Sequence, residues 1–222
     1  MIEISKLCKS YKNKEVLKGI DLSINKGEVI GLVGKNGVGK TTLMKCIAKQ
    51  LMPTTGTVFV DGKDMSMYAS HPGNIGFLMN PVFFEHLNAY DNLKFFLKIN
   101  GKGQYIDNID DALRDVDLYE ARTQNPKFFS FGMKQRLGLA MCLIDRPDYL
   151  LLDEPFVGLD PDGLKDLICL IKTLCQKRNV AVLISSHQLS ELRNVCQTFF
   201  MMVEGTLKRI SIDELDEWGS LL

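Results

Sequence analysis

The segment GKNGVGKT at residues 34–41 constrains the fold of this chain more than any other feature of its sequence. It follows VIGLV at residues 29–33, which is uniformly apolar, as in a central parallel strand covered on both faces. The run TTLMKCIAKQL that continues from it is predicted to be a helix. The segment therefore fits the pattern G-x-x-x-x-G-K-[ST] in the strand, loop and helix context that the pattern requires. This context predicts a phosphate-binding loop and argues against a chance glycine-rich turn.

The residue types in this loop suit the phosphates of a nucleotide. Glycines let successive backbone N–H groups curl around the β-phosphate. Lys40 is predicted to place a cation on the β- and γ-phosphate oxygens, and Thr41 to offer its hydroxyl to Mg²⁺. The predicted nucleotide-binding residues of this segment are Gly34, Lys35, Asn36, Gly37, Val38, Gly39, Lys40, Thr41 and Thr42.

A second motif, YLLLDE at residues 149–154, supplies the carboxylates that ATP chemistry needs. Asp153 ends an apolar strand, where it can face the phosphate loop and hold Mg²⁺ directly or through water. Glu154 comes next, in position to orient or deprotonate an attacking water. Lys40 and Glu154 are therefore candidate catalytic residues. The two motifs together indicate a P-loop nucleoside triphosphatase with ATP and Mg²⁺ as its cofactors.

The pattern of strands and helices predicts an α/β fold. Residues 2–4 and 16–24 alternate with a period of two, which is typical of antiparallel strands in an N-terminal β subdomain. From residue 29 onward strands alternate with helices, and this order predicts a mostly parallel central sheet.

A helical subdomain is expected inside this sheet, at about residues 81–145, because two amphipathic helices occur between residues 88 and 119. The chain is predicted to end in a hairpin around Glu204 and Gly205, followed by a short acidic tail. A length of 222 residues fits one large α/β domain, so residues 1–222 are taken as a single ATPase domain.

Composition argues against several classes of protein. Lys and Arg total 27, as do Asp and Glu, and no basic block occurs, so nucleic acid is not an expected partner. The start MIEISKLCKSYKNK lacks the apolar core of a signal peptide, and no uncharged run reaches the length of a bilayer span, so a soluble chain is expected. Six scattered cysteines without a CxxC pair predict reduced, buried thiols in a cytosolic protein.

Six motifs occur in a fixed order along the chain: Tyr11, the phosphate loop, SFGMKQR at 130–136, LLLDEP at 150–155, GLD at 158–160 and SSH at 185–187. In this order the chain resembles the ATP-binding subunit of ABC transporters over essentially its full length. Within that family, SFGMKQR and the segment EHLNAYDNL resemble the ATPases of bacitracin resistance and lantibiotic immunity, which are paired with separate six-helix permeases.

The resemblance implies roles for three residues outside the two nucleotide motifs. Tyr11 is expected to stack on adenine, the alternative being an ordinary edge-strand tyrosine. His187 follows an apolar strand and is expected to hydrogen-bond the γ-phosphate, as a third catalytic residue. Asp160 is expected to contact a partner subunit, and as a helix N-cap it also has a structural role.

The segment FSFGM at 129–133 stands where the family usually has LSGGQ, which binds the γ-phosphate of an ATP held by the other subunit. Ser130 and Gly132 match that motif, whereas Phe131 replaces the first glycine and Met133 the glutamine. Independently of the resemblance, a serine beside exposed backbone N–H groups at a helix start makes an anion site. Asn80 is assigned to the place of a family glutamine that reaches Mg²⁺ and the attacking water.

The resemblance further implies an ATP-sandwich dimer, formed with a second copy or a paralogous ATPase, that powers separate transmembrane permease subunits. The expected docking site is the surface around residues 80–90 and the helical insert, with Phe83, Phe84 and Leu87, unless these side chains belong to the core of the insert. The expected function is export of a peptide, antibiotic or lipid-like substrate by a cytoplasmic protein peripheral to the inner face of the membrane. Two alternatives are an ABC ATPase coupled to a signalling or remodelling partner and a non-transport ABC ATPase.

Overall fold

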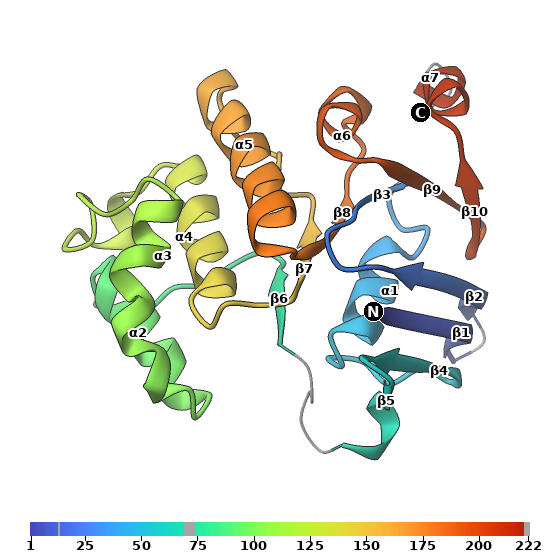
Figure 1. The fold of residues 1–222 in the computed structure, drawn as a ribbon, viewed down its shortest axis with the longest axis horizontal. Helices are drawn as coiled ribbons and strands as arrows, with labels where there is room; N and C mark the ends of the chain where they lie inside the picture. Colours follow the sequence, from blue (N-terminus) through green and yellow to red (C-terminus); the bar gives the residue numbers. More distant parts are fainter. Residues whose placement is uncertain (13, 69–73, 220–222) are drawn as a thin grey trace.

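The computed structural model describes residues 1–12, 14–68 and 74–219, which form two β-sheets with helices between and around them (Figure 1). The N-terminal sheet has the antiparallel strand order β2-β1-β4-β5. Its strands are β1 (Ile2–Tyr11), β2 (Lys14–Ile24), β4 (Thr55–Val60) and β5 (Lys63–Asp64). The antiparallel N-terminal subdomain predicted from the sequence is confirmed.

The first strand is longer than predicted, because it runs to Tyr11 and not only over residues 2–4. Its register against β2 shifts between Ile4 and Leu7 and again before Lys9. Lys6 has a positive φ of 46° inside this irregular stretch. Such a bulge breaks the alternation of side chains, so the period-two pattern stops while the strand continues.

The second sheet has the strand order β10-β9-β3-β8-β7-β6. Its strands are β3 (Val29–Val33), β6 (Ile75–Leu78), β7 (Tyr149–Asp153), β8 (Ala181–Ser185), β9 (Thr198–Val203) and β10 (Thr206–Ile210). Among the described strands of this second sheet, the pairing of β10 with β9 alone is antiparallel, through a hairpin whose turn residues Glu204 and Gly205 both have positive φ. The predicted mostly parallel sheet and its terminal hairpin are confirmed.

The central strands are apolar throughout because both faces of the sheet are covered. In β3, Val29 and Val33 pack into a core with α2 to α6, whereas Ile30 and Leu32 pack into a second core with α1 and the N-terminal sheet. The same alternation between the two cores runs along β7 and β8. The helix α1 (Lys40–Ile47) is thus held between the two sheets (Figure 1).

Three helices lie between β6 and β7 in the chain and gather on one side of the molecule, in green and yellow in Figure 1. They are α2 (Ala89–Ile99), α3 (Ile109–Asp115) and α4 (Phe131–Leu143), accompanied by the short 3-10 helices η2 (Gly103–Asn108) and η3 (Pro126–Phe128). The remaining helices are α5 (Pro161–Arg178), α6 (Leu189–Val195) and η1 (Met65–Met67).

The short acidic segment that was expected after the hairpin forms a helix, α7 (Ile212–Gly219). Ser211 and Glu214 cap its start reciprocally: the Ser211 N–H donates to Glu214 Oε2 at 2.8 Å, and the Glu214 N–H to Ser211 Oγ at 3.2 Å. The Lys208 ammonium lies 3.0 Å from Glu214 Oε1. These bonds lower the pKa of the Glu214 carboxyl, the backbone bond from Ser211 first.

Two other expectations concern membranes and thiols. In the described part of the chain, no helix is long and apolar enough to cross a bilayer. All six cysteines are free, but the expectation that they are buried is wrong for Cys169, which is exposed on α5, and for Cys8, which is half-buried. Burial raises the pKa of the Cys46 thiol to about 11.

Candidate functional site

The phosphate loop occupies residues 34–39, between the end of β3 and the first residue of α1. Gly34 and Gly39 have φ of 151° and 125°, and both are closely surrounded. A Cβ at Gly34 would lie 2.6 Å from the Met202 carbonyl oxygen, and one at Gly39 3.0 Å from Leu17 Cδ2. The loop conformation therefore depends on glycine at these two positions.

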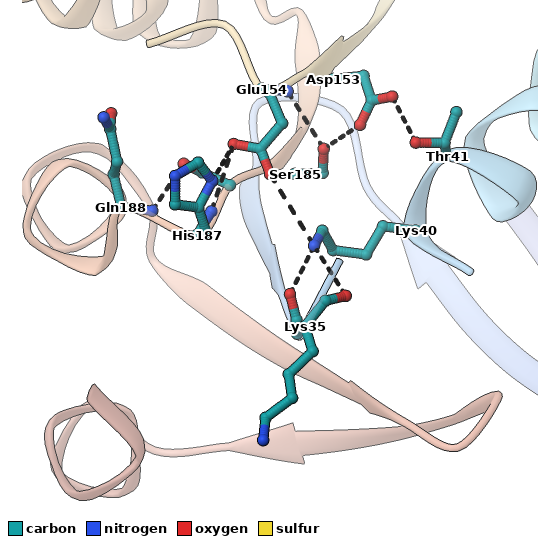
Figure 2. Close-up of polar contacts among 10 residues, drawn as sticks. Lys35, Lys40, Thr41, Asp153, Glu154, Ser185, His187 and Gln188 are labelled. Atoms are coloured by element: carbon teal, nitrogen blue, oxygen red, sulfur yellow. Dashed lines mark hydrogen bonds and ion pairs between the residues drawn. The ribbon is translucent and has the colours of Figure 1, made fainter. Parts of the chain in front are cut away.

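Lys40 carries the cation of the loop and is only 6% exposed. Its Nζ donates to the carbonyl oxygens of Gly34 at 2.5 Å and Lys35 at 3.4 Å, and lies 3.9 Å from Glu154 Oε1 (Figure 2). Burial lowers the pKa of the Lys40 ammonium, and the nearby carboxylates of Glu154 and Asp153 oppose that shift. The ammonium is thus aimed at the space that the loop surrounds.

Asp153 joins the phosphate loop to the central sheet. The Thr41 hydroxyl donates to Asp153 Oδ2 at 2.6 Å, and the Ser185 hydroxyl donates to Oδ1 (Figure 2). The register of β7 against β8 places Asp153 opposite Ser185, which makes the second bond possible. Hydroxyl and carboxylate oxygens are ligands that Mg²⁺ takes, so Thr41 and Asp153 have donors that suit the magnesium site, which stays a prediction.

Glu154 has a left-handed backbone, with φ of 51°, which is uncommon for a residue with a side chain. Its N–H donates to the Ser185 carbonyl oxygen at 3.0 Å. Its Oε2 lies 2.9 Å from His187 Nδ1, whereas its buried Oε1 has no hydrogen-bond partner among the described residues (Figure 2). The carboxylate is therefore held at one oxygen and has a free acceptor at the other, beside Lys40.

These residues line one cavity of about 140 Å³. Its lining brings together the predicted residues Asn36, Gly37, Gly39, Lys40, Thr41, Thr42, Asp153 and Glu154. His187 borders it through Glu154. The central part of the sequence-predicted site is thus assembled within a single chain.

Tyr11 lies at the end of β1, where it pairs with Lys14 across the first hairpin. Its side chain is 46% exposed. The strand that follows, β2, reaches the phosphate loop, since the Val16 carbonyl oxygen would lie 3.2 Å from a Cβ at Gly39. The hairpin that carries Tyr11 thus leads to the loop, and the adenine-stacking role of this exposed ring stays a prediction.

Asn80 follows β6, and the pairing of Leu78 with Leu152 brings it to the same end of the sheet as Glu154. It is exposed, with a positive φ of 39°, and among the described residues it makes no hydrogen bond to Thr41 or Asp153. The segment beside it is packed under α4, because a Cβ at Gly138 would lie 2.6 Å from Pro81 Cγ. Its magnesium role therefore stays a prediction.

Ser130 and Gly132 are not brought to the phosphate loop of their own chain. Ser130 is exposed and is the N-cap of α4, with its Oγ accepting a hydrogen bond from the Met133 N–H at 3.2 Å. Figure 1 shows α4 well separated from α1, on the other side of α5 and β7. Neither Ser130 nor Gly132 belongs to the lining of the cavity at this chain's own phosphate loop.

Asp160 is the N-cap of α5, with its Oδ1 accepting from the Gly163 N–H at 2.9 Å. Its structural role is thus confirmed, and its predicted contact with a partner subunit stays a prediction. Ser185 was named from the sequence only as part of SSH, and its role was missed: its hydroxyl and carbonyl hold Asp153 and Glu154. The sequence signal for this role is a serine that ends one buried strand while an acid ends the neighbouring strand.

Comparison with known proteins agrees with this geometry. The ABC transporter family pattern matches residues 17–157. Bacitracin transport ATP-binding protein BcrA of Enterococcus faecalis is 36% identical over 220 residues, which cover 97% of this chain and 70% of that protein. Lantibiotic transport ATP-binding protein SrtF of Streptococcus pyogenes is 35% identical over 208 residues, or 93% of this chain and 89% of that protein.

Among solved structures, the dimeric structure of MJ0796, a bacterial ABC transporter cassette, has a TM-score of 0.86 at 23% identity. The match covers 96% of this chain and 99% of that chain, and it shows that the fold is shared. The fold, the phosphate loop with its carboxylates and the match over most of the chain agree. The chain belongs to the ABC transporter family, as one of its ATP-binding ATPase subunits.

Proposed function

We propose that this chain hydrolyses ATP in a sandwich dimer and so powers a transporter whose membrane-spanning subunits are separate chains. The observation that carries the dimer is the separation of two anion sites on one chain, the phosphate loop and the start of α4. Neither is a complete ATP site. In the dimer, each ATP lies between residues 34–42 of one chain and residues 130–132 of a second copy or a paralogous ATPase.

The nucleotide site of each chain would use the residues predicted from the sequence. Tyr11 stacks on adenine, the loop from Gly34 to Thr42 binds the phosphates, and Asp160 lies at the dimer contact. Thr41 and Asp153 would hold Mg²⁺, with Asn80 as a further proposed ligand, and the ion would supply positive charge to the phosphates.

Glu154 is the proposed general base. Its Oε1 accepts a proton from water while the water oxygen attacks the γ-phosphorus and the bond to the bridging oxygen of ADP breaks. His187 holds Oε2 and reaches the γ-phosphate, and Lys40 faces the charge that develops on the phosphate oxygens. Loss of the γ-phosphate then removes the contact to Ser130, and the dimer opens.

The helices between β6 and β7 are proposed to form an inserted subdomain, residues 81–145, within one domain spanning 1–222. Phe84 is 45% exposed beside a groove of about 450 Å³, whereas Phe83 packs against the core. We therefore assign permease docking to Phe84 with the half-buried Leu87, and only in part to Phe83. Docking there puts the chain on the cytoplasmic, inner face of the membrane.

The proposed substrate class is a peptide antibiotic or a similar amphipathic molecule, moved outward. This rests on the names of two relatives, one for bacitracin transport and one for lantibiotic transport. Each spans most of this chain at more than 30% identity.

The decisive test is Glu154→Gln. The amide cannot take the water proton, so turnover should fall at least about 100-fold while ATP binding persists. A stable ATP-bound dimer should then elute from a sizing column, which Glu120→Gln, an exposed control, should not produce. A Glu154→Gln chain that stays monomeric with ATP would count against the sandwich.

A mixture of two defective chains tests the shared site directly. Lys40→Ala damages the phosphate loop and Ser130→Arg the start of α4, so each variant alone has no intact site. A mixed dimer has one intact site, formed by the loop of the second chain and Ser130 of the first. Absence of occluded ATP in the mixture would refute the assignment of Ser130 to the partner's ATP.

A further inference from the structure

Phe131, the first residue of α4, packs its ring on the loop that leads away from Glu154. A Cβ built on Gly158 would lie 2.3 Å from Phe131 Cδ1 and 2.6 Å from Cε1. Gly158 also has a φ of 73°, so the ring rests where the backbone of this loop carries no side chain. The contact exists only because residue 131 is aromatic and residue 158 is glycine.

A second contact runs in the opposite direction between the same two segments. The side chain of Leu159 lies over Gly132, since a Cβ there would be 3.4 Å from Leu159 Cδ2. Phe131 thus covers Gly158 while Leu159 covers Gly132. The start of α4 and the loop interdigitate, each placing one apolar side chain over a glycine of the other.

The loop at residues 155–159 is fixed at both ends. On one side Val157 N–H donates to the Glu154 carbonyl oxygen at 3.4 Å, and Phe156 is buried at 2% exposure. On the other side Asp160 caps α5. A displacement of Gly158 is therefore transmitted over few residues to Glu154, and a displacement of Phe131 to its neighbour Ser130.

We propose that Phe131 is a positioning residue that couples the Ser130 half site to Glu154 of the same chain through its contact with Gly158. This inference rests on the proposed function, in which Ser130 binds the partner's γ-phosphate. Binding of Ser130 to that phosphate fixes the position of the loop at residues 155–159. This loop in turn fixes the position of the Glu154 carboxylate beside Lys40. Each chain then aligns its own base only when its α4 is engaged by the partner's ATP.

The ring is suited to this role because it bridges the two segments without being part of the core. It is 55% exposed, so its removal leaves no buried cavity. Alanine at the first position of a helix is also well tolerated. A role limited to stability would therefore show little effect, whereas a positioning role changes turnover.

The test compares Phe131→Ala with Phe131→Tyr. Alanine should lower kcat about 10-fold, because small displacements of a catalytic group are costly, and the effect should fall on kcat and not on KM. Tyrosine keeps the ring and its hydroxyl can point to solvent, so it should restore kcat to within about twofold of the native chain.

Gly158→Ala isolates the contact itself. The backbone strain that alanine introduces at residue 158 is the same in the native chain and in the Phe131→Ala chain. The clash of its methyl group with the ring exists only when Phe131 is present. We expect it to lower kcat about 30-fold in the native chain and only about threefold in the Phe131→Ala chain, a coupling typical of residues in contact. Equal losses in both backgrounds would overturn the inference.

Ser130→Asp, measured in parallel, separates this inference from the proposed function. If it abolishes turnover while Phe131→Ala leaves kcat unchanged, the dimer stands and the role of Phe131 is refuted. If both variants leave turnover unchanged, the proposed function itself fails. A loss with Ser130→Asp, a smaller kcat loss with Phe131→Ala and rescue by tyrosine would support both.

Discussion

The two anion sites of this chain are built in opposite ways. The phosphate loop is held by neighbouring groups: Lys40 is 6% exposed, and Thr41 and Ser185 both donate to Asp153. The start of α4 presents an exposed serine, flanked by Phe128 and Phe131, whose side chains are 76% and 55% exposed. The first site is enclosed by groups of its own fold, whereas the second is exposed at the surface. A substitution in the phosphate loop should therefore weaken ATP binding. A substitution at the start of α4 should lower turnover and leave ATP binding to the single chain unchanged.

The largest expected effect comes from Lys40→Ala, which removes the buried cation of the phosphate loop. Loss of one partner from a buried charged contact costs several kcal/mol, so ATP affinity should fall at least about 100-fold by calorimetry. Lys172→Ala, which removes an exposed cation from α5, is the matched control and should bind ATP normally. Unchanged affinity in the Lys40 variant would remove this ammonium from the phosphate site.

The second-largest effect is expected from Ser130→Asp, which changes the exposed site at the start of α4. Aspartate caps a helix as well as serine does, so the thermal midpoint should stay within about 3 °C of the native value. Its carboxylate repels a γ-phosphate, so turnover should fall at least about 50-fold while affinity of the monomer for ATP stays within about twofold. An ATP-driven dimer in a Ser130→Asp/Glu154→Gln chain would contradict the exposed half site.

The smallest of the three effects concerns His187, which borders the phosphate loop through Glu154. His187→Ala removes the 2.9 Å contact from Nδ1 to Glu154 Oε2 and should lower kcat about 10-fold. Gln188→Ala changes the adjacent residue, whose side chain points away from Glu154 in Figure 2, and should leave kcat unchanged. A His187 variant that loses ATP affinity but keeps kcat would instead make this histidine a binding residue alone.

The phosphate side was predictable from the sequence because its signals are local and continuous. An apolar strand, a glycine-rich loop and a helix follow one another at residues 29–47, and Asp153 ends another apolar strand. Parallel pairing alone then brings the loop and the acid to one end of the sheet. The role of Ser185 was not predicted because it depends on the strand register that pairs it with Asp153, 32 residues away in the chain.

Other features were not predicted, because they depend on packing between distant residues or on short polar motifs. The bulge in β1 hid the strand beyond residue 4, and the box formed by Ser211 and Glu214, which starts α7, was overlooked inside an acidic segment. Phe131 was recognised only as a departure from the family motif. Its partner Gly158 lies 27 residues away, and a sequence pattern does not reveal a ring lying over a distant glycine.

The glycine contact on α4 has a mechanical consequence. Ser130 caps one end of this helix, and Gly138, about 12 Å further along, lies on Pro81 beside Asn80. With so little space at that contact, the helix can tilt about Gly138 more easily than it can slide. A tilt of about 10° carries Ser130 through about 2 Å, which is most of a hydrogen-bond length. Gly138 and Phe84 line the same groove, so a tilt about this contact would move the Ser130 end of the helix most and the groove beside Phe84 least.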